Sequence, residues 1–375
     1  DMPRIQDKPP SCSAKDTAVK SVAGTLAAPF PYFGGKSLAC DAVWRAFGLV
    51  DNYVEPFAGS AAMLLGAPDG KRVETINDAD GFVANFWRAI VADAEAVAMH
   101  ADWPVNEVDL FARHSWLVRQ AGGLTDRLHA DPDYYDAKMA GWWCWGSCNW
   151  IGTGWCSGTG PWKHDGERLV NSREQGDAGR GINKQLPHLG DAGKGINKKL
   201  PHLGDAGQGI NKQLPHLGNA GRGINSPRGE FIREWFYILQ ARMRDVRVTC
   251  GDWGRVVKDS VTTRHGVTAV FLDPPYTKGE MNYAVGGVGG PLADEVRSWC
   301  SINGQNKALR IVLCGHAGEH DALLKNGWFT VPWVARKGYA VTDEAVANSA
   351  SETVWCSPHC QPEINVTNDL FMETA

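Results

Sequence analysis

Apolar strand-like runs that alternate with helical segments constrain the fold of this chain more than any other feature. The runs are short and rich in Val, Ile and aromatic residues, whereas the segments between them repeat apolar residues at helical spacing. We expect strands at 51–57, 73–76, 246–250, 267–272, 309–313, 329–334 and 353–357, and helices at 61–65, 82–99, 231–243, 292–300 and 319–325. Such alternation predicts a doubly wound α/β sheet that binds ligands beyond the carboxyl ends of its strands.

The stretch 93–228 interrupts this alternation. It is richer in Trp and Gly than its flanks, and we interpret it as an inserted domain of mainly helical or irregular structure. Its tryptophans crowd into 141–155, where we expect them to build the core of a small domain more than to stack on bases. The α/β domain would then comprise 29–92 and 229–375, preceded by a flexible tail over 1–28.

Near-identical copies of a 14-residue repeat, beginning with GDAGRGINKQLPHL, fill 176–225. Each full copy carries three glycines and a proline, so it can neither sustain a helix nor bury much core, and we predict turns. Basic residues exceed acidic ones between Arg168 and Arg247, although the whole chain has a net charge of −4. The repeat is therefore either a basic arm for phosphate contact or, as we favour, a surface expansion without a ligand.

Neither a secretion signal nor a membrane span is expected. The first 28 residues lack an uninterrupted apolar run, and no later stretch approaches the roughly 18 apolar residues that a span requires. We therefore expect a protein of the cytoplasm, in a bacterial or phage-infected cell, with its ten cysteines mostly reduced. Cys144, Cys148 and Cys156 lie near His164 but lack the paired CxxC pattern of zinc sites, so no metal is predicted.

The strongest chemical signal is Asp273-Pro274-Pro275-Tyr276, directly after the apolar run 267–272. An amino group conjugated to a purine ring is a poor nucleophile, because its lone pair is delocalised into the ring. The carboxylate of Asp273 and the carbonyl of Pro274 can each accept one of its N–H groups and so localise the lone pair. Pro275 helps to fix the backbone, and Tyr276 offers a stacking face to an extruded base. The alternative is a proline turn that ends a strand.

A second signal is the strand-to-helix turn at 53–60, where Gly59 permits close approach of a ligand. Asp78 follows about 20 residues later, where an acid can bind ribose hydroxyls; helix capping is the alternative. After a third strand, Asp252 could accept from an adenine amino group and Trp253 could flank the ring, or the pair could be a cap and a core aromatic. The turn contributes the candidate cofactor-binding residues Glu55, Phe57, Ala58, Gly59 and Ser60.

These motifs resemble those of Dam-type adenine-N6 DNA methyltransferases with the motif order cofactor binding, target recognition, catalysis. The family motifs appear as PYFGGKS at 31–37, VEPFAGS at 54–60 and DPPY at 273–276, in the expected order. The resemblance covers about 29–359 outside the insertion. It implies a Rossmann-like methyltransferase sheet, mostly parallel with an antiparallel closing strand, that uses S-adenosylmethionine (SAM) and acts on double-stranded DNA.

The resemblance also implies roles for individual residues. Tyr32 and Lys36 would lie at the methionine end of the cofactor, where an ammonium can pair with its carboxylate. Asp78 and Asp273 would contact the cofactor, Asp273 while it holds the target amine. The insertion corresponds to the target-recognition domain, and its repeats and Trp-rich segment look closer to phage-associated members, so no recognition sequence is carried over.

The sequence thus predicts a site-specific methyltransferase that flips adenine out of DNA and methylates its N6 amine. It needs no metal and no obligate protein partner, and it could act as a monomer. Methylation of cytosine at N4 is one alternative, although serine is frequent at the position of Asp273 in the cytosine enzymes. A catalytically idle DNA-binding protein of the same fold is another, against which the intact DPPY motif and Lys36 count.

Overall fold

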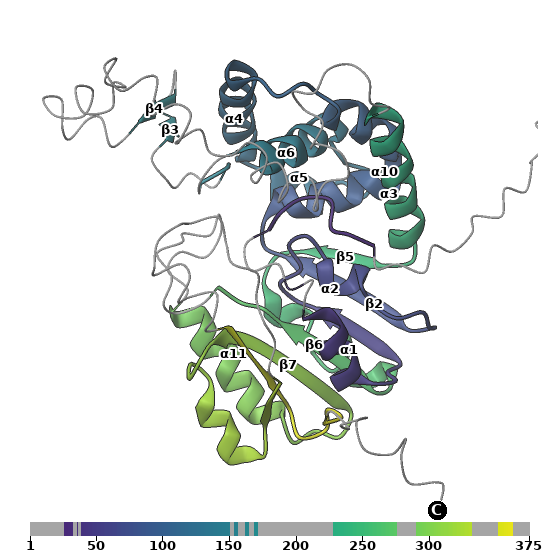
Figure 1. Cartoon of the computed structure of the whole chain (residues 1–375), viewed down its shortest axis with the longest axis vertical. Helices are drawn as coiled ribbons and strands as arrows, with labels where there is room; N and C mark the ends of the chain where they lie inside the picture. The colour runs from purple at the N-terminus through teal and green to yellow at the C-terminus, as the bar shows by residue number, and fades with distance from the viewer. Residues whose placement is uncertain are drawn as a thin grey trace, which may run out of the picture.

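The computed structural model describes residues 26–32, 36, 39–150, 154–156, 162–164, 169–171, 228–275, 290–331 and 352–362. Most of the predicted tail, the 14-residue repeats and Tyr276 lie outside these ranges. Figure 1 shows a sheet with flanking helices in its lower part and a group of helices above it.

The main sheet has seven strands in the order β5-β2-β1-β6-β7-β9-β8. The strands are β1 (Asn52–Glu55), β2 (Val73–Asp78), β5 (Arg247–Cys250), β6 (Thr268–Leu272), β7 (Leu309–His316), β8 (Phe329–Val331) and β9 (Glu352–Cys356). The first five strands of this order pair in parallel, whereas β9 pairs antiparallel with both β7 and β8. This confirms the predicted α/β sheet, mostly parallel with an antiparallel closing strand. Two further strands, β3 (Trp162–His164) and β4 (Leu169–Asn171), form a separate antiparallel pair.

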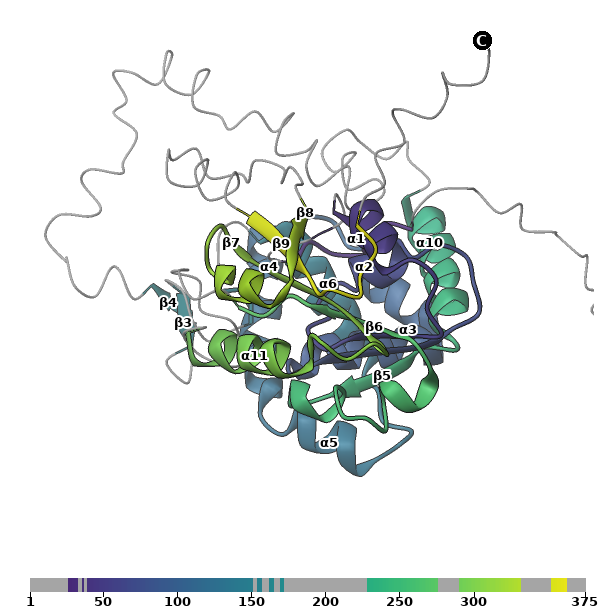
Figure 2. The same cartoon turned by 90° about the horizontal axis from the view of Figure 1, so that it is seen from below.

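Strand β6 is buried along its whole length, as expected of a parallel strand covered on both faces. Phe271 turns to the core beneath helix α1 (Cys40–Phe47), whereas Val270 and Leu272 turn to the core beneath helix α11 (Gly290–Asn303). Figure 2 shows α1 and α11 on opposite sides of β6 and β7. The apolar run that predicted this strand therefore contributes side chains to the cores on both faces of the sheet.

The upper group of helices packs around α3 (Gly81–Ala101). Helices α6 (Ala137–Asn149) and α10 (Arg228–Met243) lie against α3, and α4 (Glu107–Ala121) lies against α6. Helix α3 kinks at Asp93 and continues through the predicted domain boundary. In α6, Trp143 and Trp145 are buried, so these two tryptophans belong to the core. The group also includes α5 (Leu124–Ala130).

Two shorter elements depart from, or refine, the expectations. The helix predicted at 319–325 is instead the 3-10 helix η5 (Asp321–Asn326), which ends at Gly327 with a left-handed φ of 80°. A 3-10 helix suits this segment because only one or two turns separate β7 from β8. Helix α2 (Ala62–Leu65) is a single turn after the β1 loop. Within the described residues, none of the helices combines the length and apolar character needed to cross a bilayer.

Candidate active site

Acidic side chains gather where the carboxyl ends of the parallel strands meet. In the order of the sheet, β2 and β5 lie on one side of β1, whereas β6 and β7 lie on the other. The sheet therefore reverses its winding between β1 and β6, and such a switch point is where doubly wound sheets bind ligands. Glu55 ends β1, Asp78 ends β2, and Asp273 directly follows β6.

Lys36, Asp273 and Glu352 form a cluster that we call the lysine trio. The Nζ atom of Lys36 lies 3.2 Å from Oδ1 of Asp273 and 3.5 Å from Oε2 of Glu352. The lysine side chain is 3% exposed, and the two carboxylate side chains are 16% and 18% exposed. The trio thus brings the first and last family motifs into direct contact, although more than half of the chain separates them in sequence.

Electrostatics holds Lys36 in its charged form. Burial alone disfavours an ammonium, but the carboxylates of Asp273 and Glu352 outweigh this cost and raise the pKa of Lys36. Burial also raises the pKa of Glu352, while the ammonium of Lys36 opposes that shift. Cys314 of β7 is fully buried beside these groups, and burial keeps the pKa of its thiol well above the ordinary value.

Glu55 is a buried acid at the end of β1. Its Oε2 accepts a hydrogen bond from the hydroxyl of Tyr53, at 2.9 Å. Burial raises the pKa of Glu55 to about 8; the hydrogen bonds oppose this shift, and the nearby charges of Asp273 and Asp78 add to it. The edge of the sheet therefore gathers acids at the switch point, and the raised pKa of Glu55 favours its protonated, uncharged form near neutral pH.

The turn after β1 has the backbone that its glycine predicts. Gly59 has a left-handed φ of 48°, and its N–H donates to Oδ2 of Asp78 at 2.8 Å. A Cβ on Gly59 would lie 2.3 Å from the ring of Tyr32, so this position requires glycine. The sequence predicted the close approach of a ligand here; in the structure the ring of Tyr32 lies against this glycine. Ala58 and Ser60, on either side, are buried.

Asp78 itself is bonded to backbone on both oxygens. Besides Gly59, its Oδ1 accepts from the N–H of Asp80 at 2.9 Å. Burial raises the pKa of Asp78 to about 6 and that of Asp80 to about 7. Asp80 is the residue that caps α3, through the N–H of Phe82, so the capping role that was the alternative for Asp78 belongs to its neighbour.

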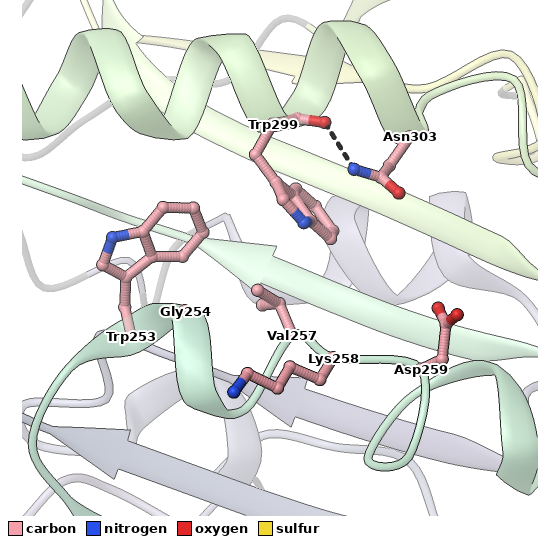
Figure 3. Close-up of a pocket in the computed structure, with 7 residues that line it drawn as sticks. All are labelled: Trp253, Gly254, Val257, Lys258, Asp259, Trp299 and Asn303. Atoms are coloured by element: carbon pink, nitrogen blue, oxygen red, sulfur yellow. Dashed lines mark hydrogen bonds between the residues drawn. The ribbon is translucent and has the colours of Figure 1, made fainter.

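The residues after β5 contribute a cap and an aromatic surface. Asp252 accepts from the N–H of Gly254 at 2.9 Å and so caps the 3-10 helix η3 (Trp253–Arg255). Trp253 stacks on Phe57, with ring centroids 5.9 Å apart, and meets Trp299 of α11 edge-on. Figure 3 shows the indoles of Trp253 and Trp299 beside a pocket. The pocket is open and has a volume of about 500 Å³. The other residues that line the pocket are Gly254, Val257, Lys258, Asp259 and Asn303.

Two residues of this edge were missed by the sequence analysis. Glu352 was one, and its signal was present: it begins an antiparallel strand, so it lies at the edge where its parallel neighbours end. Asn77 was the other. Its Nδ2 donates to the carbonyls of Pro56 and Gly251, at 3.0 and 2.9 Å, while its Oδ1 accepts from Thr249. It thereby ties β2 to β5 and to the loops after β1 and β5.

The cysteines that raised the question of a metal are packed in the core. The thiols of Cys144 and Cys148 both donate to the carbonyl of Pro29, at 3.7 and 3.8 Å. Among the described residues, no group of three or more His, Cys, Asp or Glu side chains is arranged to hold a metal ion.

A seven-stranded sheet of this order, with a glycine turn after β1 and an acid-lined switch point, is consistent with a Rossmann-like methyltransferase fold. The sequence model of the D12 class N6 adenine-specific DNA methyltransferases matches residues 32–114, which include Lys36, Gly59 and Asp78. Over residues 32–114 the chain is therefore similar to this family of adenine-specific DNA methyltransferases. No curated protein matches the chain.

Proposed function

We propose that the chain transfers a methyl group from SAM to the N6 amine of adenine in double-stranded DNA, at the edge where Asp273 follows β6. The contact between Lys36 and Asp273 carries this proposal, because it joins the two ends of the motif set at the switch point of the sheet. The family whose model matches residues 32–114 supports adenine as the base that is modified.

The donor set at the switch point suits SAM, which carries a sulfonium and an ammonium. Asp78 and Asp273 both lie at this edge of the sheet, so the site offers carboxylates to a cationic ligand. When bound, the cofactor supplies an electrophilic methyl group. We assign its ribose to Asp78, its adenine end to Asp252 and Trp253, and its methionine end to the surroundings of Tyr32 and Lys36. The β1 turn from Phe57 to Ser60 would lie along it.

Asp273 and Pro274 have the task of presenting the target amine. Asp273 is held by Lys36, and Pro274, the next residue, is buried. The fold therefore holds both acceptors in position. Each would accept one N–H of the adenine amine, which draws the nitrogen lone pair out of the ring. The base must leave the duplex to reach them, and we assign its stacking to Tyr276. Residues 93–228 are proposed to recognise the target sequence.

Radiolabelled SAM and unmethylated duplex DNA test the reaction directly. The DNA is digested to nucleosides, and we expect the label in N6-methyladenosine with the native chain and none with Asp273→Ala. Asp294→Ala is the control, since Asp294 is an exposed acid on α11 that pairs with Arg297, and it should label DNA normally. Label in N4-methylcytosine, or equal labelling by Asp273→Ala, would refute the proposal.

A further inference from the structure

Glu352 is an acid that neither the motifs nor the family match explains. The match ends at residue 114, and Glu352 lies at the start of β9. We propose that Glu352 is a positioning residue for methyl transfer: it shares the ammonium of Lys36 and thereby keeps Asp273 oriented toward the target amine and strong as an acceptor. This inference deepens the proposed function and rests on the role given there to Asp273.

The register of the sheet places Glu352 within reach of Lys36. Glu352 pairs with His316 of β7, and Cys314, two residues earlier on β7, faces the same side of the sheet. Strand β6 is the other neighbour of β7 in the sheet. Its Leu272 pairs with Leu313, so Asp273, the next residue, comes beside Cys314. Lys36 therefore bridges β6 and β9 across β7, where the small thiol of Cys314 leaves room for the ammonium.

Charge balance indicates that the buried ammonium of Lys36 needs only one carboxylate to neutralise it, so the second carboxylate is not needed for that purpose. One carboxylate neutralises one ammonium, so Lys36 and Asp273 alone would form a balanced pair. Glu352 adds a charge that is mostly buried, and desolvation of such a charge is costly. An extra acid at this position stabilises the fold less than an uncharged residue would. The surplus negative charge is useful at the point where the amine of adenine becomes positive as it is methylated.

The distances indicate how the ammonium is divided. Lys36 lies nearer to Asp273 than to Glu352, at 3.2 against 3.5 Å. An ammonium has three donors and no fixed plane, so it can serve two carboxylates at once. Without Glu352, the full attraction of Lys36 would fall on Asp273, lowering its strength as an acceptor and pulling it toward the lysine. A shift of this kind is large enough to slow a reaction that depends on alignment.

Glu352→Gln tests this role, because glutamine keeps the shape and removes the charge. We expect the single-turnover rate of methyl transfer, at saturating SAM and DNA, to fall about 10- to 100-fold. The dissociation constants for SAM and for DNA should stay within about threefold of the native values, and Glu352→Asp should recover part of the rate. Glu74→Gln is the matched control, since it also breaks a buried acid-to-cation contact, but at the opposite edge of the sheet.

A native rate in Glu352→Gln would overturn the inference. So would a loss of rate accompanied by equal losses of SAM binding and thermal stability, because that pattern indicates a structural role only. Asp273→Asn separates this inference from the proposed function. If Asp273→Asn is inactive while Glu352→Gln is fully active, only the inference about Glu352 fails; if Asp273→Asn is fully active, the proposed function itself fails.

Discussion

Two mostly buried charge trios lie at opposite edges of the same sheet. Near the amino end of β2, Glu74 is held between Arg72 and Arg242, with N···O distances of 2.9 and 2.7 Å; we call this the arginine trio. At the carboxyl edge, the lysine trio has one ammonium between two carboxylates, at 3.2 and 3.5 Å. The arginine trio carries one surplus positive charge, and the lysine trio one surplus negative charge.

The difference lies in geometry as well as in sign. Arg242 donates to both oxygens of Glu74 and also to the carbonyl of Leu64, so it fastens α10 to β2 and α2. Guanidinium groups form such planar, fixed contacts, whereas an ammonium is a point charge that its partners can share or release. Fixed contacts are suited to joining elements of the fold, and shared contacts are suited to a site where a third partner must enter.

The largest expected effect comes from the lysine trio. Asp273→Ala should lower the single-turnover rate of methyl transfer by about 100- to 1000-fold or more, because an acceptor aimed at the reacting amine is lost. The free energy of unfolding should change little, since Lys36 keeps Glu352 as its partner. Rapid-quench assays and urea denaturation measure the two quantities. If Asp273→Ala remains within tenfold of the native rate, the lysine trio does not serve the reaction in the way that we propose.

Glu74→Gln should have the opposite profile. It leaves two arginines without their carboxylate, and breaking a buried pair in this way costs about 3–5 kcal/mol. We expect this loss in the free energy of unfolding from urea titration, with the rate of methyl transfer within about twofold of native wherever the variant is folded. A fall in rate without a fall in stability would show that the arginine trio also serves the reaction.

Glu55→Gln should alter the pH dependence of stability. Folding raises the pKa of Glu55 from 4.5 to about 8, so the native state favours the protonated acid. This contribution is fully present below the unfolded pKa and is lost as pH rises through the folded pKa. The melting temperature of the native protein should therefore fall between about pH 5 and pH 9, and less steeply in the variant. Asp78 and Asp80 shift in the same direction, so some slope should remain.

Thermal melts across this pH range provide the measurement. Parallel curves for the native protein and Glu55→Gln would show that folding does not raise the pKa of Glu55. Glu55 would then not count among the protonated acids at the carboxyl edge. A steeper fall in the variant would reverse the sign of its contribution.

The smallest expected effect concerns Asp252, at the same edge as the lysine trio. Asp252→Ala removes the cap of η3 and should cost about 1 kcal/mol of unfolding free energy, whereas Asp252→Asn should restore most of it. Titration of SAM into both variants tests the proposed contact with the cofactor. Native affinity in Asp252→Ala would leave Asp252 with its capping role alone.

Much of the sheet could be predicted because its central strands β1 and β6 are buried along their whole length, and β6 is an apolar run. Each expected strand is present with its ends displaced by a few residues, as for 267–272, observed as Thr268–Leu272. The sequence also singled out Lys36 and Asp273, which the fold brings into contact. Their pairing with Glu352 could not be predicted, because it depends on the register of β9 and on the reach of one side chain across β7. Asn77 was missed for a similar reason, since its partners lie on the loop after β1 and on β5 with the residue that follows it.

The three residues of the lysine trio are also synthesised at widely separated times. During synthesis Lys36 leaves the ribosome before any strand of the sheet, Asp273 follows with β6, and Glu352 arrives with β9, the last described strand. Contacts between residues so distant in sequence form late in folding, because the intervening chain must first be ordered. A growing chain can therefore build most of its core while the charge balance at its working edge is still incomplete, and the docking of β9 is the step that completes it.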